Sequence, residues 1–367
     1  ESGEMLEAAL AAGVTAAGGD VLLGGVLPTP AAPLLIGRYG FDLGVVVSAS
    51  HNPFHDNGIK FFGPDGFKLS DEDEERIEEI LRGPVAPNPD TGRVRALHGT
   101  QEDYLRALET RFAGLDLHGL DVLLDCAHGA TFKVGPEVFR RLGATVTTIG
   151  TEPDGRNIND GVGSTHIEAL AAAVVAGGHD LGFAFDGDGD RVLAADRTGA
   201  VVDGDELIAL AALHLRAQDR LGGGVAVTVM TNYGFHTAMR EADVEVTTTA
   251  VGDRYVLAAL REKGWALGGE QSGHIIDMGF VPSGDGIASA LLTLEALAGG
   301  DLAERHGMEK LPQKLVNCRV GDKATAMAAV EAPAAEEHSA LEGRGRVLVR
   351  PSGTEELVRV MVEAPTA

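Results

Sequence analysis

Short runs rich in Val, Ile, Leu and Thr alternate with longer amphipathic stretches over most of this chain. Because this alternation is typical of strands joined by covering helices, it predicts an α/β fold with mixed, largely parallel sheets. The predicted strands are 21–26, 45–48, 122–125, 145–149, 181–185, 225–231, 244–249 and 265–268. The predicted helices are 72–81, 132–142, 167–175, 205–215, 234–241, 254–262 and 287–297.

The pattern recurs on a scale of about a hundred residues, which predicts several similar α/β domains. After Gly299 the alternation weakens, and 315–320, 347–350 and 358–363 read as strands of a smaller α+β unit. The segment 83–99, with Pro84, Pro87 and Pro89, is expected to be a connector without strand or helix. The predicted division is into three α/β domains and a small last domain, at residues 1–108, 109–208, 209–308 and 309–367.

The charge balance limits the partners of the chain. Among its 367 residues, 30 Lys and Arg face 55 Asp and Glu, a net charge of −25. Nucleic acid is therefore not an expected partner, because its phosphates require a basic face. An anionic substrate would require the few cations to be gathered in one place.

The prolines, the cysteines and the first residues of the sequence each predict something about location or about the extent of the chain. The apolar run 21–37 is interrupted by three prolines, so no membrane span is expected. Cys126 and Cys318 lie far apart without a CxxC spacing, which favours a reducing, cytoplasmic location over a disulfide framework or zinc site. The sequence starts at Glu1 within a helical pattern and without Met, so we expect residues to precede it.

A polar segment follows the predicted strand 45–48 and extends to Lys60. Loops at the carboxyl ends of strands hold ligands in open α/β sheets, which makes Ser50 a candidate nucleophile. A serine hydroxyl needs a group that takes its proton or draws on its oxygen, and His51 and Lys60 are candidates. The alternative is a capped surface loop, in which Ser, Asn and His are common.

Three carboxylates, Asp186, Asp188 and Asp190, alternate with glycines directly after the predicted strand 181–185 and precede Arg191. Alternate residues of an extended segment point the same way, and the glycines allow the backbone to curve around an ion. This pattern predicts a site for a hard divalent cation, with Mg²⁺ favoured because it keeps positions open for phosphate. An EF-hand is excluded, since its sixth position would be Arg191 instead of Gly. A solvated acidic turn is the remaining alternative.

A glycine-rich segment, 268–274, closes another predicted strand. Glu270 and Ser272 lie two residues apart, so they could offer a carboxylate and a hydroxyl to the hydroxyls or amine of a sugar. The alternative is a turn without a ligand.

The segment that begins at Arg350 follows the strand predicted at the end of the chain. Backbone amides, two hydroxyls and guanidinium groups predict a phosphate cradle, although no P-loop motif occurs. A helix cap beside a surface Arg is the alternative. The residues of the predicted cradle are Arg350, Ser352, Gly353, Thr354 and Arg359.

Five phrases together resemble the α-D-phosphohexomutase superfamily: SASHNPFHDNGIKFFGPDGFKLS, DGDGDR, VGDRYV, GGEQSGHII and RPSGTEELVRVMVE, in that order. The likeness extends over essentially the whole chain, and Gln271 favours the glucosamine branch over the glucose and mannose branches. It implies three related α/β domains and a smaller fourth around a central cleft, in agreement with the pattern above. Glu356 stands where this family usually has Pro. The family's N-terminal strand and Arg-bearing loop would precede Glu1, and its last helix is cut short here.

The resemblance also implies a role for each candidate residue. Ser50 would carry the phosphoryl group, and the three aspartates would bind Mg²⁺ together with it. The proton-handling or phosphate-stabilising residues would be His51, Lys60, Arg191 and His274. Glu270, Ser272 and His274 would hold the sugar, and the cradle that begins at Arg350 would bind its distal phosphate.

The implied activity is the interconversion of glucosamine 6-phosphate and glucosamine 1-phosphate, with Ser50 as phosphoryl carrier. A hexosamine or hexose 1,6-bisphosphate would serve as intermediate and activator, and closure of the last domain would keep water out. The expected partner is therefore a small sugar phosphate, and a homodimer is one assembly that the sequence allows. The alternatives are a phosphomannomutase or phosphoglucomutase of the same superfamily, and a non-catalytic sugar-phosphate-binding protein.

Overall fold

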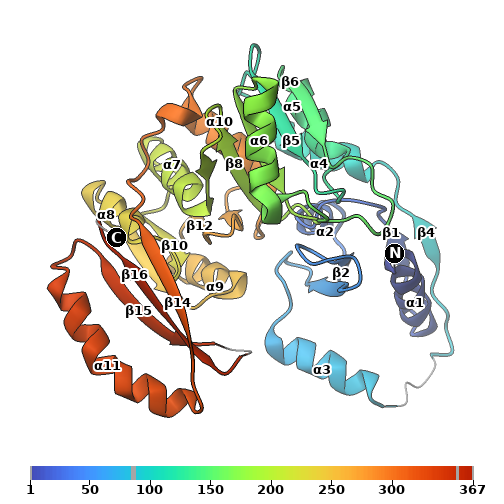
Figure 1. The fold of residues 1–367 in the computed structure, drawn as a ribbon. Helices are drawn as coiled ribbons and strands as arrows, with labels where there is room; N and C mark the ends of the chain where they lie inside the picture. The colour runs from blue at the N-terminus through green and yellow to red at the C-terminus, as the bar shows by residue number, and fades with distance from the viewer. Residues whose placement is uncertain (1, 84–87, 353–354, 366–367) are drawn as a thin grey trace.

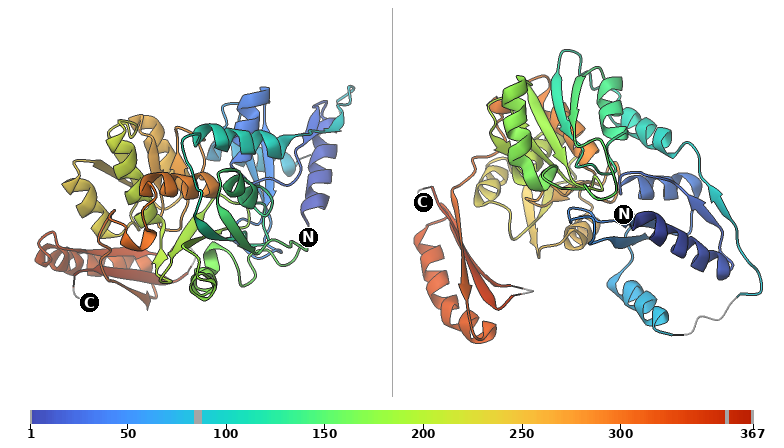
Figure 2. Two further views of the ribbon diagram at one scale, coloured as in Figure 1. Left: turned by 90° about the horizontal axis from the view of Figure 1, so that it is seen from above. Right: turned by 45° about the vertical axis from the view of Figure 1, so that its right-hand side comes forward.

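The computed structural model describes residues 2–83, 88–352 and 355–365. Pro84 and Pro87 of the expected connector, and Gly353 and Thr354 of the expected phosphate cradle, lie outside the described residues. The chain forms an arc of α/β units, with the N-terminal elements at one end and the C-terminal sheet at the other (Figure 1). Two further views separate these two ends in the same way (Figure 2).

The N-terminal unit contains two small sheets. Strands β1 and β4 pair in parallel, and β2 pairs with β3 in antiparallel fashion. The expectation that 83–99 lacks regular structure was wrong at β4, a three-residue strand too short to leave an apolar pattern. The elements are α1 (Gly3–Ala16), β1 (Val21–Leu23), α2 (Ala31–Tyr39), β2 (Gly44–Ser48), β3 (Gly58–Phe62), α3 (Asp71–Leu81), β4 (Val94–Ala96) and α4 (Thr100–Arg111).

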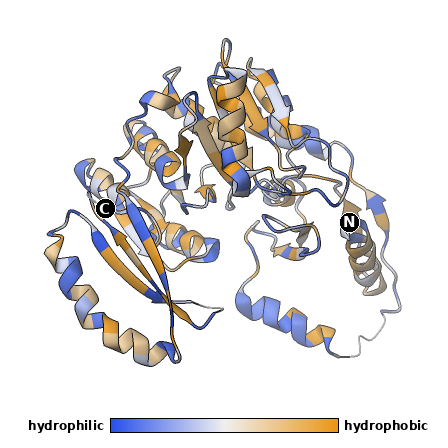
Figure 3. Ribbon diagram, in the orientation of Figure 1, coloured by the Kyte–Doolittle hydropathy of each residue, from blue (hydrophilic) through white to orange (hydrophobic). Residues whose placement is uncertain are grey.

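Helix α3 stands away from the core. It is hydrophilic along most of its length, and none of its residues is buried (Figure 3). Ser70 caps the helix by accepting a hydrogen bond from the backbone N–H of Asp73, and acidic residues fill its first turn. Capping and the favourable interaction of those carboxylates with the helix dipole stabilise this helix without a buried face.

The second unit is a five-stranded sheet in the order β6-β5-β7-β8-β9. Strands β6, β5 and β7 are parallel, whereas β8 and β9 return antiparallel. The DGDGDR turn joins β7 to β8, so the three aspartates lie at the carboxyl end of a fully buried strand. The elements are β5 (Asp121–Asp125), α5 (Val134–Arg141), β6 (Thr145–Ile149), α6 (Ile167–Gly177), β7 (Leu181–Phe185), β8 (Val192–Asp196) and β9 (Val201–Val202).

The third unit is a four-stranded sheet in the order β11-β10-β12-β13, with only β13 antiparallel. Helices α7 and α10 are its most buried helices, and they belong to an aliphatic core shared with the second unit. The elements are α7 (Gly204–Ala217), β10 (Gly224–Thr228), α8 (Tyr233–Glu241), β11 (Glu245–Thr249), α9 (Asp253–Lys263), β12 (Leu267–Gly269), β13 (Ile275–Asp277) and α10 (Gly286–Leu297).

The C-terminal unit is an antiparallel sheet in the order β14-β16-β15, with helix α11 against β15. Its strands are β14 (Gln313–Arg319), β15 (Arg346–Pro351) and β16 (Leu357–Glu363), and α11 spans Lys323–Ala340. The predicted α/β class, with mixed sheets that contain parallel strands and a smaller α+β unit, is thereby confirmed. Among the described residues, no helix is long and apolar enough to cross a membrane.

Candidate active site

Ser50 lies on the loop between β2 and β3 and has a left-handed backbone, with a φ of 52°. Few residues other than glycine adopt this conformation, and it persists where the surroundings hold it. The backbone N–H of Ser50 donates to Ser48 Oγ at 2.8 Å, and Ser50 Oγ donates to Asp186 Oδ2 at 3.3 Å. The serine hydroxyl therefore faces the aspartate turn of the second unit, as the sequence predicted.

The serine loop is fixed to the second unit through its backbone. Ser50 O accepts hydrogen bonds from Gly187 N at 3.1 Å and from Asn159 Nδ2 at 2.8 Å. Asn159 Nδ2 also donates to Asn52 O at 2.8 Å. A Cβ at Gly187 would lie 2.5 Å from Ser50 O, so the close approach of the two loops requires glycine there.

Asp186, Asp188 and Asp190 are all buried, and one carboxylate oxygen from each lies within 4.8 Å of those of the others. The Oδ1 atoms of Asp188 and Asp190 are buried without a hydrogen-bond partner. Oxygen atoms that converge and lack partners are the ligand set that a hard divalent cation requires. The aspartate turn is thus suited to a metal ion.

Lys60, on β3, lies among these carboxylates. Its Nζ contacts Asp188 Oδ2 at 2.6 Å and Asp190 Oδ2 at 2.9 Å. Burial alone would lower the pKa of Lys60, but attraction to the two aspartates outweighs it and raises the pKa. The ammonium group is therefore held in its charged form within the aspartate turn.

The electrostatic environment differs between the aspartates. Burial, together with repulsion from the other two carboxylates, raises the pKa of Asp186. Burial opposes ionisation of Asp190 as well, but Lys60, His274 and Arg191 outweigh it and lower its pKa. Of these two carboxyl groups, Asp186, which accepts from the serine hydroxyl, thus holds a proton more readily than Asp190.

Arg191 and His274 join the second and third units. They form an isolated β-bridge, and Val192 N donates to Gly273 O at 3.0 Å. His274 is buried, with Nδ1 3.6 Å from Asp190 Oδ1 and Nε2 accepting from Gly284 N at 3.2 Å. The predicted neighbours of the metal turn are thus brought together from distant segments.

His51 is the most open of the predicted residues near Ser50. Partial burial, with a smaller contribution from Arg191, lowers its pKa, so the neutral imidazole is favoured. A neutral imidazole can accept a proton at physiological pH, which is the chemistry that the sequence suggested.

The GEQSGH turn is next to the aspartate turn, but the side chains of Glu270 and Gln271 are hydrogen-bonded to other parts of the third unit. Glu270 Oε1 accepts from Gly252 N at 3.1 Å, and Ser272 is exposed. Gln271, the marker of the glucosamine branch, donates to Asp203 Oδ2 at 3.2 Å and so connects the turn to the start of α7.

The phosphate-cradle residues form a separate group on the C-terminal unit. Arg350 and Arg359 are paired across β15 and β16, and burial, together with the nearby Arg359 guanidinium, lowers the pKa of Arg350. Among the described residues, no hydrogen bond or ion pair joins this group to the cluster around Ser50. Lys323, at the start of α11, donates to Ser352 O at 3.1 Å and was missed by the sequence reasoning.

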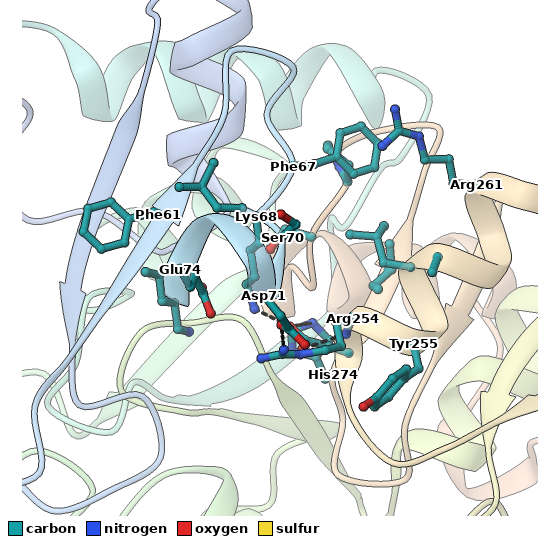
Figure 4. Close-up of a pocket in the computed structure, with 18 of the residues that line it drawn as sticks. Phe61, Phe67, Lys68, Ser70, Asp71, Glu74, Arg254, Tyr255, Arg261 and His274 are labelled. Carbon is teal, nitrogen blue, oxygen red and sulfur yellow. Dashed lines mark hydrogen bonds and ion pairs between the residues drawn. The ribbon is translucent and has the colours of Figure 1, made fainter. Parts of the chain in front are cut away.

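A cavity of about 700 Å³ lies beside Lys60 and His274, between the β3–α3 segment and α9 (Figure 4). Lys68 pairs with Asp253 and Arg254 with Asp71 across it. Arg261 lies over the ring of Phe67, 4.6 Å from its centroid. The cavity is therefore lined by both signs of charge and adjoins the predicted phosphoryl-transfer residues.

Two buried residues of the cluster were not predicted, Asn159 and Thr29. Thr29 Oγ1 donates to Asp188 Oδ2 at 2.7 Å, and its backbone N–H donates to Asp188 O at 2.8 Å. Thr29 precedes a helix and Asn159 lies in a turn, where Thr and Asn are common without any ligand, so the local sequence does not mark either residue.

Comparison with known proteins agrees with this arrangement. Four family models of phosphoglucomutase/phosphomannomutase match nearly the whole chain: α/β/α domain I over residues 1–84, domain II over 96–199, domain III over 203–316 and the C-terminal domain over 315–367. The chain belongs to the phosphoglucomutase/phosphomannomutase family, a family of phosphohexomutase enzymes.

Within this family, the chain is similar to proteins with one particular name. A phosphoglucosamine mutase of Moorella thermoacetica is 51% identical over 375 residues, which cover 99% of this chain and 84% of the relative.

Two solved structures share the fold. A phosphoglucomutase/phosphomannomutase family protein of Burkholderia thailandensis has a TM-score of 0.84 at 24% identity, covering 99% of this chain and 82% of that one. An Aspergillus fumigatus N-acetylphosphoglucosamine mutase, solved with GlcNAc-6P and magnesium, has a TM-score of 0.72 at 19% identity, covering 92% and 89%.

Proposed function

We propose that this chain interconverts glucosamine 6-phosphate and glucosamine 1-phosphate through a phosphorylated Ser50. The name of the Moorella relative supports the substrate, as does Gln271 in the sugar-binding turn. The observation that carries the chemistry is the serine hydroxyl 3.3 Å from the first of three converging aspartates, with Lys60 bound to the other two.

Mg²⁺ is the ion that we propose for the aspartate turn. Asp186, Asp188 and Asp190 would hold it, together with the phosphate on Ser50. When bound, it would neutralise the charge of the transferred phosphoryl oxygens. The magnesium in the Aspergillus structure supports this choice.

The chain's own cations act on the same group. Phosphoryl transfer depends on positioning and on stabilising charge at the equatorial oxygens. Lys60 is held in its charged form by Asp188 and Asp190. Arg191 is placed on the same turn by the hydrogen bond from its backbone N–H to Asp186 Oδ1 at 3.1 Å. His51, and His274 from the third unit, are the groups that we propose to move protons to and from the sugar hydroxyl.

In this proposal the third unit binds the sugar, and the C-terminal unit binds its second phosphate. Glu270, Ser272 and His274 would hold the sugar hydroxyls or amine, and Arg350, Ser352 and Arg359 the distal phosphate, together with Gly353 and Thr354 outside the described residues. A phosphate site remote from Ser50 suits a reaction in which either end of a bisphosphate must face the serine. The C-terminal unit would close over the sugar to complete the site and exclude water.

The proposal extends to the intermediate, the domain boundaries, the location and the assembly. A hexosamine or hexose 1,6-bisphosphate would be both intermediate and activator, and the boundaries at residues 108, 208 and 308 are kept as predictions. A cytoplasmic location and assembly as a homodimer are also predicted.

The test is a comparison of kcat/KM for glucosamine 6-phosphate, glucose 6-phosphate and mannose 6-phosphate on the same preparation. The proposal predicts the highest value for glucosamine 6-phosphate. A higher value for glucose or mannose 6-phosphate would assign the chain to another branch of the family.

A further inference from the structure

The connection between the third and the C-terminal units passes over the start of α8. Arg305, early in this linker, pairs with Glu206 at 2.7 Å and with Asp196 at 3.1 Å. Lys310 pairs with Asp203. A Cβ at Gly234 would lie 1.9 Å from Glu309 O, so the linker backbone packs directly against α8. The linker is therefore attached to the third unit as far as Leu311, and the C-terminal sheet begins two residues later.

Asn232, the N-cap of α8, is fully buried at the end of this attachment. Its Oδ1 accepts from Gly234 N at 3.0 Å and from Leu311 N at 3.0 Å. Its Nδ2 donates to Leu311 O at 3.0 Å and to Glu363 Oε1 at 3.3 Å. All four hydrogen-bonding positions of one amide are thus used, and three of them reach the linker or the C-terminal sheet.

The same end of the C-terminal sheet is fixed around Asn232. Glu363, the last residue of β16, is fully buried and accepts from Tyr233 N at 3.1 Å and from Arg346 Nε at 2.6 Å. Arg346, the first residue of β15, also donates to Thr231 O at 2.6 Å. Residues 231 to 233 therefore contact the linker and two of the three strands of the sheet.

The phosphate-cradle residues lie at the opposite end of these strands. From Arg346 to Pro351 the strand extends about 17 Å, at about 3.4 Å per residue. A rotation of about 5° around the Asn232 end would thus displace the start of the cradle by about 1.5 Å, and displacements of about 1 Å can cost about 100-fold in rate. A small rotation at Asn232 would therefore become a larger displacement at Arg350.

We propose that Asn232 is a positioning residue that sets the orientation of the C-terminal sheet, and with it the place where the distal phosphate of the sugar is bound. This inference rests on the proposed function for its substrate, but the contacts that carry it do not depend on which sugar is bound.

The test is Asn232→Ser, which adds no charge and keeps a residue that caps helices well, but is too short to reach Leu311 and Glu363. The expected results are faster hydrogen exchange at the Leu311 amide and about tenfold weaker binding of glucosamine 6-phosphate by calorimetry. In the kinetic assay, KM should rise more than kcat falls, because the aspartates and Ser50 are untouched.

Thr293→Val is the matched control, since it removes a buried hydrogen bond of α10 that does not touch the linker. It should leave Leu311 exchange and KM at wild-type values. Arg346→Met tests the same junction from the sheet side, because it removes the hydrogen bonds of Arg346 to Glu363 and to Thr231 O. It should reproduce the effect of Asn232→Ser on KM, so the inference can be tested even if one of the two variants folds poorly.

Wild-type exchange at Leu311 or wild-type affinity in a folded Asn232→Ser protein would overturn the inference. Absence of mutase activity in the wild-type chain would instead overturn the proposed function, and the exchange measurement would still decide the role of Asn232.

Discussion

Replacement of Asn159 by Ala tests whether the serine loop must be fixed to the aspartate turn. The change removes the hydrogen bonds from Asn159 Nδ2 to Ser50 O and to Asn52 O, both 2.8 Å. Two such bonds contribute about 2 kcal/mol together. Asn159 also has a φ of 59°, and Ala in this left-handed conformation adds about 1 kcal/mol of strain. The free energy of unfolding should therefore fall by about 3 kcal/mol.

The effect on activity follows from the lost bonds alone. If the loop must be held for transfer, about 2 kcal/mol corresponds to a loss of about 30-fold in kcat/KM. The assay is coupled detection of glucosamine 1-phosphate, with urea unfolding of the same protein. Asn157→Ala is the control, because in the described part of the chain the Asn157 side chain hydrogen-bonds only within its own loop, to Asp154 N and Glu152 O. Equal kcat/KM for Asn159→Ala and Asn157→Ala would refute this reasoning.

Two further changes probe the charged groups. Asp188→Asn keeps the shape of the side chain but removes the charge of one proposed metal ligand, so calorimetry should detect loss of Mg²⁺ binding. In the wild-type protein, EDTA should stop the reaction until Mg²⁺ is restored. Undiminished Mg²⁺ affinity in the variant would contradict the metal assignment. Burial raises the pKa of Asp285 to about 7, above its unfolded value of 3.8, so the stability it contributes is present below pH 4 and lost as pH rises toward 7. Asp285→Asn, which keeps an N-cap and an acceptor for Tyr104, should flatten that decline, and equal slopes of unfolding free energy against pH would exclude this role.

The sequence predicted the parts of the site that lie within continuous motifs. Ser50, Lys60 and the three aspartates were expected because a strand end and a distinctive residue pattern coincide in each segment. The α/β alternation predicted the strands and helices of the buried sheets for the same local reason.

Other parts depend on tertiary contacts that local patterns do not contain. Asn159 contacts a loop more than a hundred residues away, and Thr29 contacts Asp188, which lies 159 residues further along the chain. Asn232 resembles an ordinary helix cap, and the packing of the linker and of the C-terminal sheet gives it three further hydrogen bonds. Short strands such as β4 depend on pairing with β1 instead of on their own composition.

The cation distribution also became clearer in the structure. Lys60 and Arg191 approach the aspartate turn, whereas Arg350 and Arg359 lie together on the C-terminal sheet. The four cations thus form two groups on different units. Under the proposed function, closure of the C-terminal unit would bring both groups to one substrate.

Mass measurement of Ser50 tests the central claim most directly. After incubation with glucose 1,6-bisphosphate and Mg²⁺, the account predicts one phosphate on Ser50 and turnover of glucosamine 6-phosphate, with neither in a folded Ser50→Ala protein. Turnover in Ser50→Ala, or an active wild-type enzyme whose Ser50 never carries phosphate, would contradict it.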